Sequence, residues 1–105
     1  MATNKLFLWN SGATGATSST GYSQAAQAPF PHKVVSAYLA TGTGGASITV
    51  QGTITGGSTW HTLDTLTLTG AAGEDTSELI NAYDYIRLDL TSCTGTVVAR
   101  IRSVE

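Results

Sequence analysis

The chain has 105 residues, a formal net charge of −2 and a single cysteine. This length predicts one domain that buries a core without disulfide staples. Five basic residues and a pI of about 5.5 argue against nucleic acid as a main partner. No apolar run approaches the ~20 residues of a membrane helix, so we expect no membrane partner either.

Threonine takes many positions where charged residues are usual. Charged residues make up 11% of the chain, against about a quarter in typical soluble domains. From residue 48 to residue 69, threonines and other polar residues alternate with the apolar residues Ile48, Val50, Ile54, Leu66 and Leu68. Period two is typical of half-buried strands. We therefore expect a threonine face that is either solvated through its hydroxyls or packed inside an assembly.

Strands are predicted, in chain order, at residues 5–10, 34–41, 47–55, 59–63, 65–69, 76–80, 83–91 and 96–104. Segments 59–63 and 65–69 are expected to join as one strand with a bulge at Asp64. Glycine-rich turns at 42–45, 56–57, 70–73 and 91–95 separate the strands. Seven or eight short strands at this spacing predict an all-β domain, a sandwich or a small barrel.

Residues 11–27 are mostly Gly, Ala, Ser and Thr, with no charge and with Tyr22 as the one large side chain. A loop of this length is uncommon in a compact domain. Two arrangements are open: an extended arm that lies on a neighbouring molecule, or a surface loop folded back on its own domain. The best helical candidate in the chain is a single turn at residues 23–27.

The last two strands are predicted to pair with each other. Alternation then places Arg87 and Asp89 on the same face as Arg100 and Arg102. We expect a cross-strand ion pair between Asp89 and one of these arginines, which would help to fix the register. The three arginines together are a second possibility, a contact patch for a partner.

The sequence contains no pattern typical of a catalytic or metal site. His61 and Asp64 are three residues apart, which places them on opposite faces of a strand. The glycine-rich loops lack the ending of a phosphate-binding loop. Residues 53–60 resemble an Asp-box hairpin with Thr55 in place of its aspartate, and we interpret them as a structural turn with Trp60 folded over it. We expect no enzyme activity, no metal and no cofactor.

Four features of residues 47–104 carry a family resemblance: the strand 48–52, the turn Gly57-Ser58-Thr59-Trp60, the Thr-Leu repeat at 63–68, and Tyr83-Asp84-Tyr85-Ile86-Arg87. Together they resemble the head decoration or cement proteins of tailed bacteriophages. The resemblance implies an antiparallel jelly-roll-like β-sandwich without enzyme activity. It also implies a protein that binds the outer surface of the phage head and stabilises contacts between major capsid subunits.

The expected partners are the major capsid protein and further copies of this chain. Because closed symmetry is common in homo-oligomers, we expect a dimer or trimer on a capsid symmetry axis. A lone cysteine fits synthesis in the host cytoplasm before the protein joins the virion. The expected partner surface collects aromatic and basic residues: Phe7, Trp9, Tyr22, Phe30, His32, Arg87, Arg100 and Arg102.

Two other functions stay open at this point. A carbohydrate-binding module would stack sugars on aromatic side chains, for which the candidates are Trp9, Tyr22, Tyr38, Trp60, Tyr83 and Tyr85. A small tail or connector protein would share the fold and the assembly role.

Overall fold

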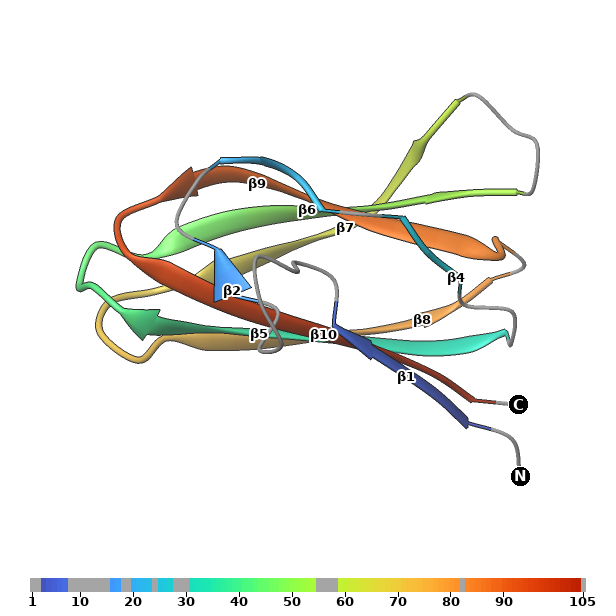
Figure 1. Ribbon diagram of the computed structural model, residues 1–105, viewed down its shortest axis with the longest axis horizontal. Coiled ribbons are helices and arrows are strands. Elements are labelled where there is room, and N and C mark those ends of the chain that lie inside the picture. Colours follow the sequence, from blue (N-terminus) through green and yellow to red (C-terminus); the bar gives the residue numbers. More distant parts are fainter. Residues whose placement is uncertain are drawn as a thin grey trace.

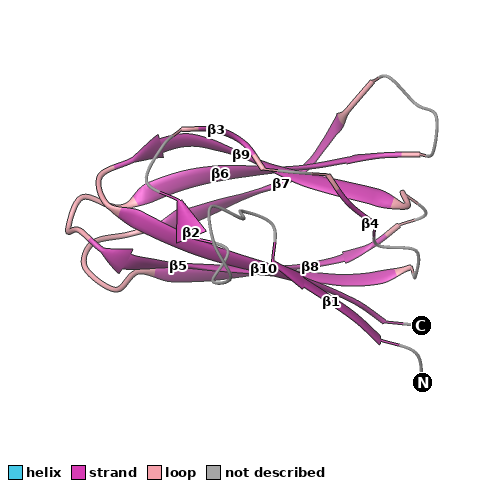
Figure 2. Cartoon of the chain, in the orientation of Figure 1, coloured by secondary structure: helices cyan, strands magenta, loops and turns pink. Residues whose placement is uncertain are grey.

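The computed structural model describes residues 3–7, 16–17, 20–23, 25–27, 31–54, 59–81 and 83–104. These residues form two antiparallel sheets packed face to face (Figures 1 and 2), and none of them is helical. The strands are β1 (Thr3–Phe7), β2 (Ala16–Thr17), β3 (Gly21–Tyr22), β4 (Ala26–Gln27), β5 (His32–Thr41), β6 (Ala46–Thr53), β7 (His61–Leu68), β8 (Glu74–Ile80), β9 (Tyr85–Cys93) and β10 (Thr96–Val104).

The strand order is that of a jelly roll, which confirms the predicted fold class. Sheet A has the order β1-β10-β5-β8, and sheet B has the order β3-β9-β6-β7. The short strand β2 lies beside β10 on the same sheet as β1, and β4 lies beside β9 on the same sheet as β3. The segments from β5 onward alternate between the sheets, apart from the β6–β7 hairpin. Such alternation produces the two Greek keys of a jelly roll.

The core lies between the sheets and follows the predicted alternation. Ile48, Val50, Leu66 and Leu68 are buried as expected, whereas Ile54 is 58% exposed because it lies just beyond the end of β6. The threonines of β7 lie on the exposed face of that strand. Among the described residues, the core cluster is Val35, Ala37, Leu39, Ala46, Ile48, Val50, Leu66, Leu68, Ile86, Leu88, Leu90, Val97, Ala99 and Ile101.

The predicted pairing of the last two strands is wrong. β9 lies beside β6 in sheet B, and β10 lies beside β5 in sheet A. Arg87 is therefore opposite Gln51, while Arg100 is opposite Ser36 on the other sheet. Alternation identifies which side chains share a face of one strand, but it carries no information about which strand lies alongside. Arg87 and Asp89 therefore lie in sheet B and Arg100 in sheet A, so the predicted neighbourhood of Arg87, Asp89 and Arg100 does not form.

The two strands predicted at 59–63 and 65–69 form the single strand β7, as expected. Val50 pairs with Asp64 and Gln51 pairs with Thr62, so Leu63 is the extra residue on β7. The bulge therefore lies one residue before the expected position. It lets β7 place Leu63 against the core while Asp64 stays at the edge.

The helical turn predicted at residues 23–27 is wrong. β3 and β4 pair with β9, and Ser23 lies between them. The Ser23 N–H donates to the Leu88 carbonyl at 2.7 Å, and the Ser23 hydroxyl accepts from the Leu88 N–H at 2.8 Å. Both hydrogen bonds bridge the gap between the two short strands, so they hold this segment along β9.

The described parts of segment 11–27 pair with strands of the same chain, β2 with β10 and β3 and β4 with β9. This is the folded-back arrangement for those residues. The remaining residues of the segment lie outside the described part of the chain, and an arm that contacts a neighbouring molecule stays a prediction for them.

Side chains join the two sheets along the edge formed by β7 and β8. The Thr67 N–H donates to a carboxylate oxygen of Asp75 at 3.1 Å. The Ser77 hydroxyl donates to the carboxylate of Asp64. An edge strand with open N–H groups is a template for pairing with another chain. The carboxylate of Asp75 occupies one such group, so this edge is less open to strand addition.

Candidate functional site

Arg87 lies on the outer face of sheet B between two aromatic side chains. Its guanidinium carbon is 3.9 Å from the centroid of the Tyr22 ring and 4.4 Å from that of Trp60. Its Nε donates to Oε1 of Gln51, on the neighbouring strand β6, at 2.8 Å. Each cation–π contact of this kind contributes about 0.5–1 kcal/mol at an exposed site. We call Tyr22, Gln51, Trp60 and Arg87 the Arg87 cluster.

Four separate segments position this cluster, and strand pairing or hydrogen bonds fix each of them. Arg87 stands on β9, a central strand of sheet B, with Gln51 directly opposite it. Tyr22 is held in place by the pairing of β3 with Asp89 and by the neighbouring Ser23 hydrogen bonds. The Thr53 hydroxyl donates to the Thr59 carbonyl at 2.8 Å, which anchors the segment that carries Trp60. The cluster is thus assembled before any partner arrives.

The cluster combines the residue types that dominate binding energy in protein interfaces. Tyr, Trp and Arg are enriched at hot spots because they bury large areas with few rotatable bonds. Tyr22 is 60% exposed, so much of its surface is available for a partner. A planar guanidinium can donate in parallel to a carboxylate, and its stacking between rings holds that plane in one orientation.

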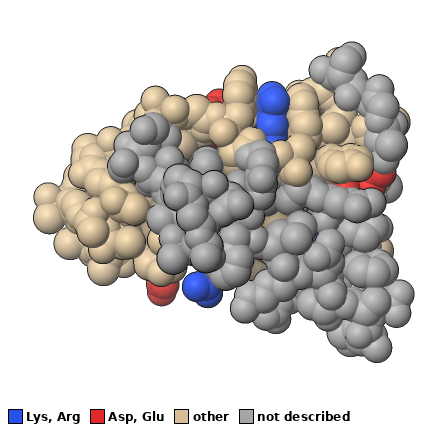
Figure 3. Space-filling view, viewed as in Figure 1, with Lys and Arg blue, Asp and Glu red and all other residues tan. Residues whose placement is uncertain are grey.

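Hydroxyls surround the cluster on the outer face of sheet B. Alternation places Ser47 and Thr49 of β6 on this face, beside Thr65 and Thr67 of β7. Asp89 of β9 lies opposite both Tyr22 and Thr49. Figure 3, in the orientation of Figure 1, shows few Lys, Arg, Asp and Glu side chains among the described residues on that side of the molecule. The face therefore offers short hydrogen-bonding groups around one fixed cation.

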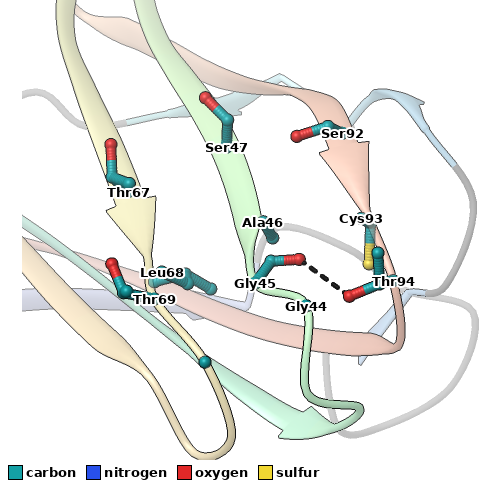
Figure 4. A pocket seen from close by; sticks show the side chains of 11 residues that line it. Gly44, Gly45, Ala46, Ser47, Thr67, Leu68, Thr69, Ser92, Cys93 and Thr94 are labelled. Atoms are coloured by element: carbon teal, nitrogen blue, oxygen red, sulfur yellow. Dashed lines mark hydrogen bonds between the residues drawn. The ribbon is translucent and has the colours of Figure 1, made fainter.

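A shallow pocket of about 340 Å³ lies at the end of the sandwich where the β5–β6, β7–β8 and β9–β10 turns meet (Figure 4). It is lined by Gly44, Gly45, Ala46, Ser47, Thr67, Leu68, Thr69, Gly70, Ser92, Cys93 and Thr94. The Thr94 hydroxyl donates to the Gly45 carbonyl at 3.2 Å, and the Cys93 thiol donates to the Gly95 carbonyl at 2.8 Å. These bonds fix the turns. The lining contains no charged side chain and no histidine, and the Cys93 thiol is its one titratable side chain.

The structure separates the predicted interface residues between two faces. Tyr22 and Arg87 meet in the Arg87 cluster on sheet B. His32 and Arg100 are exposed on sheet A, where His32 Nε2 lies 3.4 Å from a carboxylate oxygen of Glu78. The remaining members of the predicted set, Phe7, Trp9, Phe30 and Arg102, have side chains outside the described part of the structure. A partner surface made of all eight stays a prediction.

From the sequence, Trp60 is expected only as a turn or sugar-stacking residue, and no pattern singles out Gln51. The position of Trp60 over sheet B can be expected from its place in the sequence, because a tryptophan at the end of a hairpin turn can fold over the adjacent strand. Gln51 carries no such signal, because its role depends on the pairing of β6 with β9. The stacked ring pair His61 and Tyr83, with centroids 5.5 Å apart, was not predicted either.

Among the described residues, no group of three or more His, Cys, Asp and Glu side chains is placed to hold a metal ion. In the same residues, no helix has the length and apolar character needed to cross a membrane.

Comparison with known proteins gives similarity in fold and none in sequence. No family model and no curated protein matches the chain. The SPBc2 prophage-derived protein YomS superposes with a TM-score of 0.67 at 14% identity, covering 100% of this chain and 96% of that one. Chitosan-binding module 1 from a chitosanase/glucanase of Paenibacillus sp. IK-5 gives a TM-score of 0.50 at 15% identity, covering 95% and 92%. Both likenesses concern the jelly-roll sandwich.

Proposed function

We propose that this chain is a non-enzymatic structural protein of a bacteriophage particle, a decoration or cement protein on the outer surface of the head. In this role it binds the major capsid protein and stabilises contacts between capsid subunits. The observation that carries the proposal is the Arg87 cluster, a cation fixed between two aromatic rings on an otherwise hydroxyl-rich sheet face. The end-to-end likeness of the fold to a prophage-derived protein supports the coarser part of this proposal, a structural protein of a bacteriophage.

The physical properties of sheet B suit attachment to a repeating protein surface. Its outer face carries few charges and presents one preorganised anchor, so little conformational entropy is lost on binding. Each contact can be weak, because copies bound together on a symmetric shell reinforce one another. A dimer or trimer on a symmetry axis would use this avidity directly.

Binding to shells tests the proposal. Purified protein is mixed with empty shells assembled from the major capsid protein of the same phage genome, and the shells are sedimented. We expect saturable co-sedimentation and a higher unfolding temperature of the decorated shells. Absence of co-sedimentation at micromolar protein, with shells of confirmed integrity, would overturn the assignment to the head surface and leave the tail or connector role.

Carbohydrate binding is the second candidate function. The exposed Tyr22 ring, the partly exposed Trp60 ring and the fold likeness to a chitosan-binding module favour it. However, the Arg87 guanidinium occupies one face of each ring, and its charge repels the protonated amines of chitosan. A glycan array and titration with chitosan oligosaccharides decide this point. Binding that is lost in Trp60→Ala, together with no shell binding, would establish the carbohydrate function instead.

A further inference from the structure

Among the described residues that are buried, Lys33 is the one with a charged side chain, and 1% of its surface is exposed. It stands near the start of β5, in phase with the core residues Val35, Ala37 and Leu39, so it points between the sheets. A buried ammonium is costly unless it is well paired, because it loses its hydration. Burial lowers the pKa of Lys33 from its usual 10.5, and the nearby Asp84 carboxylate raises it by less. Burial therefore makes the neutral, nucleophilic form of this amine easier to reach than in an exposed lysine.

The amine is held against the side-chain amide of Asn81, just beyond the end of β8. Lys33 Nζ donates to Oδ1 of Asn81 at 3.0 Å and to the Asn81 backbone carbonyl at 3.0 Å. The Tyr83 N–H donates to the same Oδ1 at 3.1 Å. Two donors on Oδ1 fix the amide plane and polarise its carbonyl. One carboxylate oxygen of Asp84, Oδ1, is buried in the same region.

These four groups match what amide exchange between two side chains requires. The reaction needs an amine near an amide carbon, a donor on the amide oxygen, and an acid–base group that moves the protons. Lys33 supplies the amine, Asn81 the amide, and the Tyr83 N–H the donor. The Asp84 carboxyl group supplies the proton transfer.

We propose that Lys33 and Asn81 form an intramolecular isopeptide bond. The neutral Nζ attacks Cγ of Asn81, and the Tyr83 N–H stabilises the negative charge that develops on Oδ1. Asp84 accepts a proton from Nζ and returns a proton to the departing amide nitrogen. The Nζ–Cγ bond forms, the Cγ–Nδ2 bond breaks, and one ammonia molecule leaves. No electrons are transferred, so no oxidant or reductant is needed, and Asp84 ends as it began.

Such a bond would join β5 to the end of β8 within sheet A, across 48 positions of sequence. A covalent link over that distance restricts the unfolded chain, as a disulfide does, without requiring an oxidising compartment. The single cysteine of this chain excludes an intrachain disulfide. Resistance to unfolding would suit a protein that is assembled in a cytoplasm and then exposed outside it.

Intact-mass measurement of the purified wild-type chain under denaturing conditions tests the proposal. We expect a mass lower than the sequence mass, corrected for any removal of Met1, by one ammonia molecule. After proteolysis, tandem mass spectrometry should find a branched peptide that contains both Lys33 and Asn81. Asp84→Asn should fold, as judged by circular dichroism, and should keep the full sequence mass.

Two results would overturn the proposal. The first is a wild-type chain at full sequence mass, with separate linear peptides for Lys33 and Asn81. The second is an ammonia loss confined to a linear peptide around Asn81, which indicates a succinimide. Lys33→Met separates these cases as well, because it abolishes the isopeptide bond and leaves succinimide formation possible. The mass and the peptides of the wild-type chain decide between these outcomes even if Lys33→Met does not fold.

Discussion

Arg87 on β9 and Tyr22 on β3 are in direct cation–π contact, with 3.9 Å between the guanidinium carbon and the ring centroid. The contact ties the short edge strand to a central strand of sheet B through side chains as well as backbone. Among the described residues on the outer face of that sheet, Arg87 is the one cation that such contacts hold in place. The stability and the binding of this region therefore depend on the same residues.

A double-mutant cycle measures the energy of this contact. Arg87→Ala and Tyr22→Ala should each lower the free energy of unfolding, and their coupling energy should be about 0.5–1 kcal/mol. Urea unfolding of both single variants and the double variant supplies the numbers. Arg87→Ala combined with Tyr38→Ala on sheet A is the control and should be additive. Equal coupling in both cycles would argue against a specific contact.

Ser23 is expected to matter more than its size suggests. Ser23→Ala leaves the buried Leu88 N–H without its hydroxyl acceptor. An unsatisfied buried donor costs about 1–3 kcal/mol, which corresponds to a Tm decrease of roughly 4–8 °C per kcal/mol in a domain of this size. Ser92→Ala, at an exposed position of β9, should change stability by less than about 0.5 kcal/mol. Similar Tm values for the two variants would show that the Ser23 bond contributes little.

Gly95 should tolerate no side chain. A Cβ at this position would collide with the backbone carbonyl of Thr41 and lie 2.9 Å from the Cα of Gly42. Gly95→Ala therefore forces the β9–β10 turn away from the end of β5, at a cost of several kcal/mol. Gly70→Ala meets nothing within 4 Å and is strained only by its φ of +69°, so we expect a loss of about 1 kcal/mol. Thermal unfolding should rank the two in this order; the reverse order would contradict the packing.

The stability of a chain with an uncoupled Lys33 amine should rise with pH. In Asp84→Asn the carboxylate that raises the Lys33 pKa is gone, so burial lowers that pKa further below 10.5. Between the lowered pKa and 10.5 the unfolded chain binds a proton that the folded chain does not, and stability increases with pH across that window. Urea midpoints over this range, compared with Lys33→Met in the same background, isolate the effect. A difference in urea midpoint that stays constant or falls as the pH rises would contradict this expectation.

The fold class could be predicted because alternation reports directly on which faces are buried. The strand at residues 96–104 and the buried positions Ile48, Val50, Leu66 and Leu68 follow from that pattern alone. Strand neighbours could not be predicted in the same way, since β9 and β10 are consecutive in sequence yet belong to different sheets. The wrong prediction that Arg87 and Arg100 lie on neighbouring strands has this origin.

The candidate site could be predicted only in part. Tyr22 and Arg87 are residue types suited to an interface, but their contact depends on β3 and β9 being neighbours. Lys33 carries a usable signal in the sequence, because it is in phase with Val35, Ala37 and Leu39 on an otherwise apolar face. Its partners Asn81 and Asp84 lie in a turn whose path the sequence pattern does not define.

Titration of capsid shells with matched arginine variants tests the central claim, that the outer face of sheet B is the binding face. Arg87→Ala and Arg100→Ala each remove one positive charge, the first from sheet B and the second from sheet A. We expect Arg87→Ala to weaken shell binding by at least tenfold, which is about 1.4 kcal/mol, and Arg100→Ala to bind as wild type. Wild-type binding by Arg87→Ala, with loss in Arg100→Ala, would place the contact on sheet A and contradict the account.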